Sequence, residues 1–313
     1  MGQRQPVYNT RPSEDQGTTE TTYMRPLAAF CALFALPGAA FAQSPVQKPF
    51  FSKQILLGAH RGGADQWPEN TLYGFQEAAK AVPGVLLETD ARLTADGEVV
   101  LLHDKTLDRT TDGTGDVTAK TLAEVKALDA AYRFTTDSGA TFPLRGKGIT
   151  VPTLKEVLDA LPDSHILVDL KGDAPLADAA IAVMRACDAE GRVLLASFVP
   201  SAMDRARQLA PDMAYCYDMK NGAALLMALR GPAWDAYVPA ADVLSVDEDM
   251  IPQHKLTADE IKRMQAKGIR FQVHTINAPS RMKEYVVQGV DSILTDNPSV
   301  LAKVIDESTP ASK

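Results

Sequence analysis

Two neighbouring stretches of the sequence concentrate residues that could perform acid–base and phosphate chemistry. GAHRGGADQWPENT, residues 58–71, carries His60, Arg61 and Glu69. ETDARLTADGEVVLLHD, residues 88–104, adds further charged groups: Glu88, Asp90, His103 and Asp104. Apolar, strand-like runs separate these charges, whereas a solvated surface would scatter them. The pattern therefore predicts that the charged residues meet in one site.

Three carboxylates of this set have the composition of a metal site. Glu88 and Asp90 are two residues apart on a strand-like run, so they point to the same face, and Asp169 lies near the end of another run. Crowded carboxylates raise one another's pKa unless a cation neutralises them, and an all-oxygen set without Cys suits Mg²⁺ or Ca²⁺ better than zinc. We therefore expect one divalent metal ion, Mg²⁺ or Ca²⁺, held by these three residues. The alternative is that they form salt bridges with nearby cations, namely Arg61, Arg92 and Lys171.

The two imidazoles indicate proton transfer. Histidine can take and give a proton near neutral pH, and two of them beside a phosphodiester can act in turn as base and acid. We expect His60 and His103 to be catalytic. Arg61 and Lys171 would then hold the phosphate oxygens. The planar guanidinium of Arg61 could donate two parallel hydrogen bonds to them.

A barrel of alternating strands and helices would bring these residues together. Eight apolar runs have the pattern of strands buried on both faces, at residues 54–60, 85–91, 165–171, 193–198, 213–218, 242–247, 269–275 and 290–296. The amphipathic stretches between them often begin at Thr or Pro and end at Gly, as helices do. We therefore predict the α/β class and a closed (β/α)8 TIM barrel, with active residues at the carboxyl ends of the strands.

One connection interrupts this alternation. LTADGEVVLLHD follows the second run too closely for a helix, and Asp96-Gly97 favours a hairpin turn. We predict a β-hairpin that returns His103 to the barrel mouth, within an insertion covering about residues 94–151. This insertion would contain one helix, at 121–131, and would serve as a substrate lid.

The composition of the chain limits its partners. The 313 residues are 45% hydrophobic and 23% charged, which is ordinary for a globular protein, and the formal net charge is −8. An acidic chain without a basic face is not expected to bind nucleic acid. A local cluster of Arg, Lys and metal could still bind a small anionic substrate, so a small molecule is the expected partner.

The first 42 residues differ from the rest. Residues 1–23 are polar and rich in Ser and Thr, and we interpret them as disordered and upstream of a true start at Met24. Residues 24–42 have the layout of a secretory signal peptide, with cleavage expected after Ala42 and export to the periplasm or the medium. The apolar run at 27–36 is too short for stable membrane insertion, and the alternative is a short interfacial helix. The mature domain would be residues 43–313, with Cys187 and Cys216 unpaired.

The ordered string HRG, PENT, ExD and TxDGxVVLLHDxxLxRTTxGxG closely resembles the glycerophosphodiester phosphodiesterase family. The match is dense over residues 58–115 and continues at VDLK (168–171), ASF (196–198), VHTIN (273–277) and TDNP (295–298). The resemblance implies a barrel hydrolase that releases sn-glycerol 3-phosphate and an alcohol through a cyclic phosphate. It also implies the roles assigned above: His60 and His103 catalytic, Arg61 and Lys171 phosphate-binding, and Glu88, Asp90 and Asp169 metal ligands.

Two positions depart from the pattern of that family. Asp169 stands where the family usually has Glu, although related sphingomyelinase D enzymes use Asp-x-Lys on the corresponding strand. His274 stands where the family favours Trp, near the headgroup side of the substrate. We expect His274 mainly to fill space, with altered substrate preference as the alternative.

Several other residues have less definite roles. Glu69 in PENT either orients the site or caps the first helix, with Asn70 or Thr71 near the N-cap. Phe198 could line the pocket. A structural role is expected for Arg109. Asp296 and Asn297 end the last strand and could shape the mouth, but a turn role before Pro298 is expected for them.

Three functions remain compatible with these residues. The first is a metal-dependent glycerophosphodiester phosphodiesterase acting on water-soluble diesters. The second is a phosphodiesterase of the lysophospholipase D or sphingomyelinase D type, which a more apolar insertion would favour. The third, an inactive barrel retained for binding, is disfavoured because every candidate catalytic residue is present.

Overall fold

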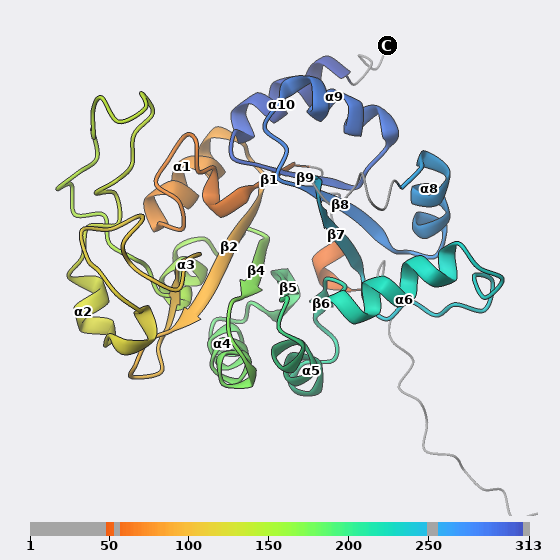
Figure 1. The fold of residues 1–313 in the computed structure, drawn as a ribbon, viewed down its shortest axis with the longest axis horizontal. Coiled ribbons are helices and arrows are strands. Elements are labelled where there is room, and N and C mark those ends of the chain that lie inside the picture. The colour runs from red at the N-terminus through yellow and green to blue at the C-terminus, as the bar shows by residue number, and fades with distance from the viewer. Residues whose placement is uncertain (1–47, 53–56, 249–255, 309–313) are drawn as a thin grey trace, which may run out of the picture. The chain divides into compact units, whose positions relative to one another are not determined.

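Eight parallel strands form a ring in the computed structural model of the chain, which describes residues 48–52, 57–248 and 256–308 (Figure 1). Each strand overlaps one of the eight predicted runs, so the predicted (β/α)8 barrel is confirmed. The predicted signal peptide and the segment before it lie outside the described residues. The eight strands are β1 (Leu57–Ala59), β2 (Leu86–Leu93), β4 (Ile166–Leu170), β5 (Val193–Ala196), β6 (Ala214–Tyr215), β7 (Val243–Asp247), β8 (Arg270–His274) and β9 (Ser292–Thr295).

The order of the strands places the end of the chain beside its beginning. Hydrogen-bonded neighbours follow the order β6, β5, β4, β2, β1, β9, β8 and β7. A single parallel bridge between Cys216 and Val243 joins β6 to β7 and completes the ring. Because all eight strands run in the same direction, their carboxyl ends share one rim, and side chains there can meet across the barrel mouth.

A hairpin follows β2, as predicted. Strand β3 (Val99–Leu101) pairs antiparallel with β2, with Ala91 opposite Leu101. At the turn Gly97 has a φ of +84°, which glycine adopts without strain, and its amide donates to the carbonyl of Thr94. The hairpin returns the chain toward the rim, where His103 follows.

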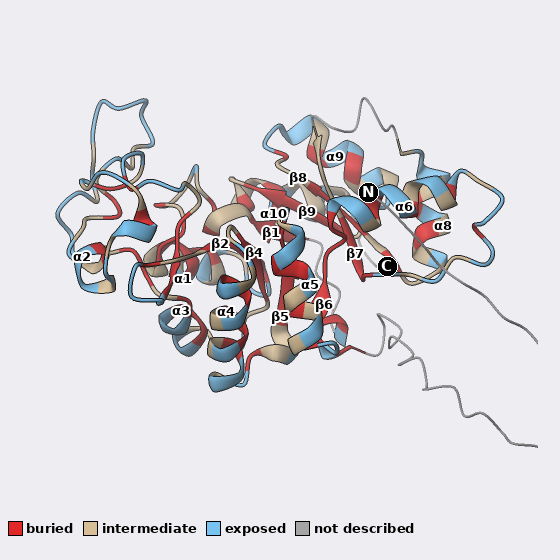
Figure 2. Ribbon diagram, turned by 60° about the horizontal axis from the view of Figure 1, so that its bottom comes forward, coloured by how far each residue is buried: buried red, intermediate tan, exposed pale blue. Residues whose placement is uncertain are grey.

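Helices cover the outside of the ring, and buried residues follow the strands and the inner helix faces (Figure 2). Four described helices begin at a threonine whose hydroxyl accepts a backbone N–H of the first turn: Thr71, Thr121, Thr153 and Thr257. None of the described helices has both the length and the apolar character that crossing a membrane requires. The helices are α1 (Leu72–Ala81), α3 (Leu154–Ala160), α4 (Ala174–Ala186), α5 (Pro200–Leu209), α6 (Met219–Leu229), α8 (Ala258–Ala266), α9 (Pro279–Gln288) and α10 (Pro298–Ser308), with short 3₁₀ turns η2 (Pro49–Ser52), η3 (His60–Gly62), η4 (Val117–Ala119) and η5 (Glu190–Arg192).

The helix predicted at 121–131 is shorter than expected. Helix α2 covers only Leu122–Lys126. Beyond it, the amide of Ala130 donates to the carbonyl of Ile149, and the amide of Asp129 donates to the carboxylate of Asp112. These tertiary hydrogen bonds replace the ones that a longer helix would make.

The insertion has a small apolar core of its own. Its buried side chains include Leu102, Leu107, Val117 and Val125, which pack together beside the barrel (Figure 1). No residue between 116 and 151 lines the cavity at the barrel mouth. The lid function predicted for this segment therefore remains a prediction.

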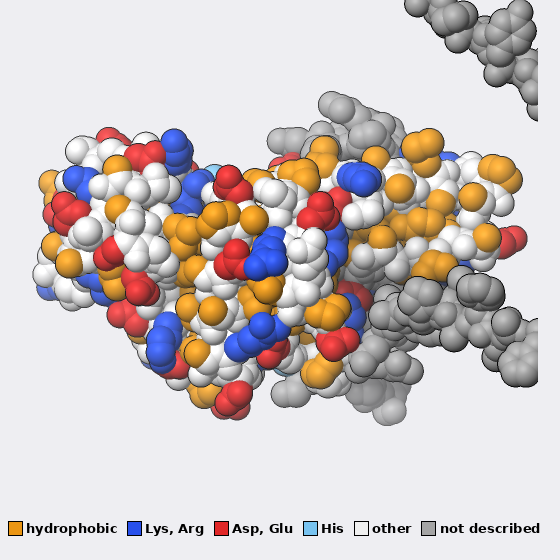
Figure 3. All heavy atoms as spheres, turned by 90° about the horizontal axis from the view of Figure 1, so that it is seen from below, with side chains coloured by type: hydrophobic (Ala, Val, Ile, Leu, Met, Phe, Trp, Pro, Cys, Tyr) orange, Lys and Arg blue, Asp and Glu red, His pale blue; other side chains and the backbone are white. Residues whose placement is uncertain are grey.

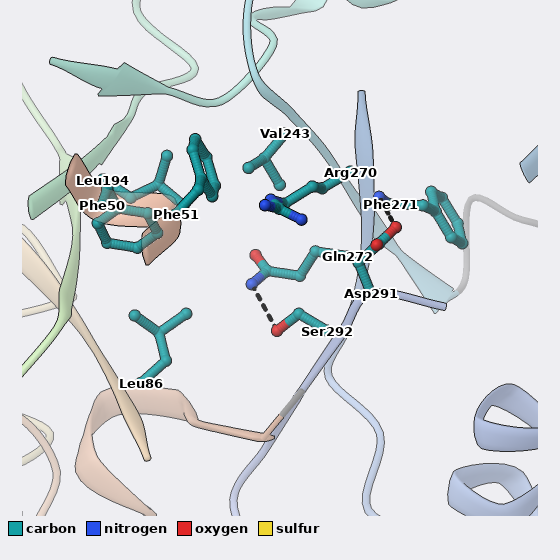
Figure 4. A pocket seen from close by; sticks show the side chains of 10 residues that line it. All are labelled: Phe50, Phe51, Leu86, Leu194, Val243, Arg270, Phe271, Gln272, Asp291 and Ser292. Atoms are coloured by element: carbon teal, nitrogen blue, oxygen red, sulfur yellow. Dashed lines mark hydrogen bonds between the residues drawn. The ribbon is translucent and has the colours of Figure 1, made fainter. Parts of the chain in front are cut away.

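The opposite end of the barrel is filled by aromatic residues from the chain entering β1. Phe50 and Phe51 lie among side chains from the amino ends of several strands and leave only a small cavity between them (Figure 4). The guanidinium of Arg270 lies 4.4 Å from the ring centre of Phe51. This packing closes the amino end, so the open mouth is at the carboxyl ends of the strands.

Candidate active site

A cavity of about 890 Å³ lies at the carboxyl ends of the strands and gathers the residues predicted to do chemistry. It is lined by both imidazoles, all three carboxylates and both cations proposed from the sequence. Phe198 and His274 also line it, whereas Glu69 does not. The residues that it brings together are His60, Arg61, Glu88, Asp90, His103, Asp169, Lys171, Phe198 and His274.

His60 follows β1 directly and is oriented by a carboxylate from the other end of the chain. Its Nδ1 lies 2.7 Å from Oδ1 of Asp296, and its Nε2 lies 4.0 Å from Oε2 of Glu88. Burial lowers the pKa of His60, but the hydrogen bond to Asp296 and the charge of Glu88 outweigh it, so the pKa is raised. Because a carboxylate can only accept, Nδ1 carries the proton and Nε2 remains available to the cavity.

Asp296 therefore does more than form a turn, because it is also the hydrogen-bond partner of His60. Asp296 follows β9, which pairs with β1, so Thr295 stands opposite Ala59 and Asp296 comes beside His60. Its second oxygen accepts from the side-chain amide of Asn277 at 2.7 Å. Asp296 is thus a functional candidate that the sequence analysis missed, although pairing the last strand with the first in a closed barrel could have revealed it.

His103 has a comparable carboxylate partner, taken from its neighbour in sequence. Its Nδ1 lies 2.7 Å from Oδ1 of Asp104, and its backbone carbonyl accepts two hydrogen bonds from the guanidinium of Arg92. The second oxygen of Asp104 accepts from Nε of Arg109 at 2.6 Å. Mainly because of the hydrogen bond from Arg109, the pKa of Asp104 falls to about 2.

Glu69 joins this cluster to the first strand and does not act as a helix cap. Its two oxygens accept from Arg109 at 2.6 and 2.7 Å and from Arg61 at 3.2 Å. The cap of α1 is Thr71. Arg109 therefore connects Asp104 with Glu69, which extends the structural role predicted for it into the support of His103.

The three carboxylates lie on two paired strands. Asp90 on β2 is directly opposite Asp169 on β4, and Glu88 lies two residues earlier on the same face as Asp90. Burial and the charge of Asp90 raise the pKa of Glu88 to about 7, and burial also raises the pKa of Asp169. Burial acts in the same direction on Asp90, but the charges of Lys171 and His103 and the hydrogen bond from Asn70 together outweigh it and lower the pKa of Asp90.

A buried asparagine fixes the position of Asp90. Asn70 donates its side-chain amide to Oδ2 of Asp90 at 3.0 Å, and its oxygen accepts from the hydroxyl of Thr89 at 2.7 Å. The backbone amide of Asn70 donates to the carbonyl of Arg61. The PENT segment therefore holds both the first and second strand ends in place.

The two predicted phosphate-binding cations are paired with the carboxylates. Nζ of Lys171 lies 2.5 Å from Asp169 and 3.1 Å from Asp90, and Nε of Arg61 lies 3.6 Å from Asp90. The backbone amide of Arg61 donates to Glu88 at 2.7 Å. The salt bridges considered as an alternative to a metal site are thus present for Arg61 and Lys171.

Two buried polar atoms in this cavity lack a hydrogen-bond partner, and each suits a different ligand. Nε of Arg61 is a free donor, as an anionic oxygen requires. Oδ1 of Asp169 is a free acceptor, as a cation requires. The donor set therefore fits a divalent metal in its chemistry. Among the residues that the structure describes, however, no three His, Cys, Asp or Glu side chains already form a cluster that could hold one.

The far side of the cavity is less charged. Burial lowers the pKa of His274 to about 4, so its imidazole is neutral at ordinary pH, and its Nδ1 lies 3.0 Å from the hydroxyl oxygen of Ser245. Phe198 is 61% exposed, and its ring centre lies 5.9 Å from Nζ of Lys171. Cys187 and Cys216 are unpaired, as expected, and Cys216 lines the cavity.

Comparison with known proteins gives consistent matches. The model of the glycerophosphoryl diester phosphodiesterase family matches residues 60–300. A glycerophosphodiester phosphodiesterase from Caldanaerobacter subterraneus subsp. tengcongensis is 28% identical over 261 residues, which cover 80% of this chain and 98% of that protein. Glycerophosphodiester phosphodiesterase 1 from Rattus norvegicus is 36% identical over 265 residues, covering 76% of this chain and 77% of the relative. A phosphodiesterase from Oleispira antarctica, solved in complex with the product sn-glycerol-3-phosphate, matches with a TM-score of 0.66 and 25% identity over 82% of this chain and 98% of its own.

Proposed function

Because the chain belongs to the glycerophosphoryl diester phosphodiesterase family, we propose that it hydrolyses glycerophosphodiesters to sn-glycerol 3-phosphate and an alcohol by acid–base catalysis between His60 and His103. One observation carries this proposal. Two imidazoles line the same cavity as three carboxylates and two cations, and the Nδ1 atom of each imidazole is hydrogen-bonded to a further carboxylate. The solved Oleispira antarctica relative, which holds sn-glycerol-3-phosphate, supports the choice of product.

The carboxylate partners define what each imidazole does. Asp296 and Asp104 accept from Nδ1, so each ring offers Nε2 to the cavity, and the raised pKa of His60 favours its protonated form. One imidazole takes the proton of the attacking glycerol hydroxyl as the new P–O bond forms. The other gives a proton to the departing alkoxide as its P–O bond breaks.

The second step reverses these roles. The imidazole that gave its proton takes one from water, whose oxygen bonds to phosphorus. The imidazole that took a proton returns it to the ring oxygen as the cyclic phosphate opens. Both imidazoles regain their starting state, so the cycle needs no external acid or base.

The cations would bind the phosphate, and the carboxylates would hold the metal. Arg61 has a free Nε, and Lys171 carries an ammonium whose pKa is raised because its attraction to Asp169 and Asp90 outweighs burial. Glu88, Asp90 and Asp169 would hold one Mg²⁺ or Ca²⁺ ion. The bound ion would neutralise charge on the phosphate oxygens and on the attacking hydroxyl.

The choice of Asp169 over glutamate has a consequence for metal affinity. Its side chain is shorter, and its free oxygen is the one available to a cation. We expect Asp169→Asn to weaken metal binding, because it removes one of three anionic ligands. Metal titration followed by calorimetry measures this directly, with Asp163→Asn as the matched control, since Asp163 does not line the cavity.

One experiment tests the proposed reaction. The purified protein, residues 43–313, is incubated with a panel of glycerophosphodiesters, and release of glycerol 3-phosphate is followed before and after addition of a chelator. We expect turnover that the chelator abolishes and that Mg²⁺ or Ca²⁺ restores. Turnover unaffected by the chelator would remove the metal from the mechanism, and no turnover of any diester would favour a binding protein.

We also propose export of the mature domain. Support comes from the signal-peptide layout of residues 24–42, a segment outside the described residues. Expression of the full sequence in a Gram-negative host, followed by cell fractionation and N-terminal sequencing, should give a periplasmic product that begins at Gln43. A cytoplasmic product with an intact first segment would contradict this.

A further inference from the structure

A second cavity, of about 830 Å³, adjoins the candidate active site between α6 and the ends of β6 and β7. Four residues line both cavities, so the two are neighbours with a common wall: Phe198, Tyr217, Ser245 and Asp247. One face of α6 supplies a further part of the lining, from Met219 through Ala223 to Leu226. Leu244 and Val246 on β7 complete an apolar wall.

Two polar groups of this second cavity, Asp218 and Ser245, are hydrogen-bonded within the protein, and Asp247 adds a carboxylate at the common wall. Asp218 accepts from the guanidinium of Arg207 at 2.7 Å and caps α6 through the amide of Asn221. The hydroxyl of Ser245 donates to the side chain of Gln272 at 2.8 Å. Because these groups already have partners, the surface they leave to a ligand is mainly apolar.

The rim of the second cavity exposes large apolar side chains. Phe198 is 61% exposed and Met219 is 57% exposed, and both line the cavity. Figure 3 shows hydrophobic side chains gathered on the side of the barrel where α6 lies. Exposed apolar side chains around an apolar hollow are typical of a ligand-binding surface, and methionine adapts its shape to a flexible ligand.

We propose that this cavity binds an aliphatic chain carried by the phosphodiester substrate. The proposal rests on the proposed function, since the phosphate held near His60 and His103 places the rest of the substrate within reach of the common wall. His274, which contacts Ser245 at that wall, is neutral at ordinary pH, so it does not impose a charge beside the chain. The favoured substrates are accordingly amphiphilic diesters with one chain, either an acyl group on the glycerol or an alkyl group on the leaving alcohol.

The size of the expected effect follows from hydrophobic transfer. Each methylene that leaves water for an apolar site contributes enough free energy for about a fourfold gain in affinity. We therefore expect kcat/KM to rise with chain length by up to about fourfold per methylene, until the cavity is filled.

Two substrate series distinguish the two sources of the chain. In the first, glycerophosphocholine is compared with its butanoyl, hexanoyl and octanoyl esters, and choline release is measured below the critical micelle concentration. In the second, butyl, hexyl and octyl esters of glycerol 3-phosphate are compared by release of glycerol 3-phosphate. If kcat/KM rises with chain length in the first series, the bound chain belongs to the glycerol. If kcat/KM rises in the second series, the bound chain belongs to the leaving alcohol.

A matched pair of variants on α6 tests the location. Ala223 and Ala224 are neighbouring exposed alanines, but only Ala223 lines the second cavity. We expect Ala223→Asp to flatten the chain-length dependence while leaving glycerophosphocholine turnover unchanged, and Ala224→Asp to behave as the wild type. Met219→Ser against Met227→Ser is a second pair, because Met227 is 78% exposed and lies outside the cavity.

The outcomes separate this proposal from the proposed function. If glycerophosphocholine is hydrolysed but neither series rises with chain length, or if both variants of a pair respond alike, the chain subsite is wrong. If no diester is hydrolysed, the proposed function fails, and calorimetry with butyl, hexyl and octyl phosphate decides the subsite. The chain subsite is retained if affinity for the alkyl phosphates rises with chain length and Ala223→Asp, but not Ala224→Asp, removes this rise. The subsite is overturned if affinity does not depend on chain length. It is also overturned if Ala223→Asp abolishes self-association of the protein.

Discussion

The two sides of the barrel mouth are built in opposite ways. The charged side, at the ends of β1, β2 and β4, has nearly every polar group held by a neighbour, as Asp90 is held by Asn70 and Lys171. The apolar side, at the ends of β5 to β7 and along α6, leaves Phe198 and Met219 exposed. The charged side is therefore preorganised, whereas the apolar side can adapt.

This difference separates catalysis from selectivity. Charges that must stabilise a reacting phosphate act best when they are fixed before the substrate arrives. An aliphatic group needs only apolar area and tolerates movement of the side chains around it. Changes on the charged side should therefore alter turnover of every diester, and changes on the apolar side should alter only the response to apolar substituents.

The largest effect is expected from the two imidazoles. His60→Ala and His103→Ala should each lower kcat by about 10²- to 10⁴-fold, the usual contribution of a general acid or base. The loss should be similar for soluble and chain-bearing diesters, because proton transfer is common to both. Steady-state kinetics with each substrate measures it, and circular dichroism checks that the fold is retained.

The carboxylate behind His60 should rank next. Asp296→Asn keeps the size of the side chain but removes the negative charge that accepts from Nδ1. We expect kcat to fall by about 10- to 100-fold, as when the carboxylate partner of a functional imidazole is lost. Asp65→Asn is the control, because Asp65 lies nearby and pairs with Asn297 outside the cavity. Equal effects from both variants would show that Asp296 matters only for local structure.

A smaller effect is expected at the partly exposed support of His103. Arg109→Gln breaks the connection between Asp104 and Glu69, and kcat should fall by about fivefold or less, because exposed ion pairs contribute up to about 1 kcal/mol. Arg109→Lys should recover part of this loss, since it restores charge without the fork. A change of several hundredfold would place Arg109 among the groups that touch the substrate.

The same variant has a defined dependence on pH. The pKa of Asp104 is lowered to about 2, so its ionised form stabilises the folded protein above the ordinary pKa, near 3.8. This stabilisation is lost as the pH falls from about 4 to about 2. The stability difference between the wild type and Arg109→Gln should therefore shrink in that range. Urea unfolding at pH 5 and pH 3 measures it, and a constant difference would contradict the ion pair.

The smallest effect is expected from Phe198 with soluble substrates. Phe198→Ala removes an exposed ring, so stability should change by no more than about 0.5 kcal/mol and the KM of glycerophosphocholine by no more than about twofold. The same substitution should reduce the preference for chain-bearing diesters. A large fall in kcat with glycerophosphocholine would show that the apolar side takes part in catalysis.

Most of the charged side could be predicted from the sequence. The alternation of side chains along a strand put Glu88 and Asp90 on one face, and the common rim of a parallel barrel put Asp169 and His60 beside them. These inferences need only the positions of the strands, which their apolar runs identify. The same reasoning located the hairpin, because Gly97 indicates the turn.

Contacts between distant loops could not be predicted in the same way. Asp296 and His60 are 236 residues apart, and they meet only because β9 closes the ring beside β1. Glu69 and Arg109 reach each other through long side chains whose rotamers no periodicity specifies. The apolar cavity was also missed, since it depends on the gap that α6 leaves against β7. Helix α2 ended early for a similar reason, because tertiary hydrogen bonds compete with helix formation there.

The closure of the ring at Cys216 makes the barrel's opening measurable. Strand β6 is two residues long, and a single bridge, from Cys216 to Val243, pairs it with β7, supported by a hydrogen bond from the amide of Tyr215 to the carboxylate of Asp242. Cys216 is 2% exposed, and burial strongly raises the pKa of its thiol, so we expect it to react slowly and to react faster whenever this seam separates. In a protein with Cys31 replaced by Ser, the rate of thiol labelling at Cys216 can be compared with the rate at the half-buried Cys187. A change in this ratio would report how often the seam opens. Adding a substrate whose chain binds beside α6 would show whether that chain keeps the seam closed.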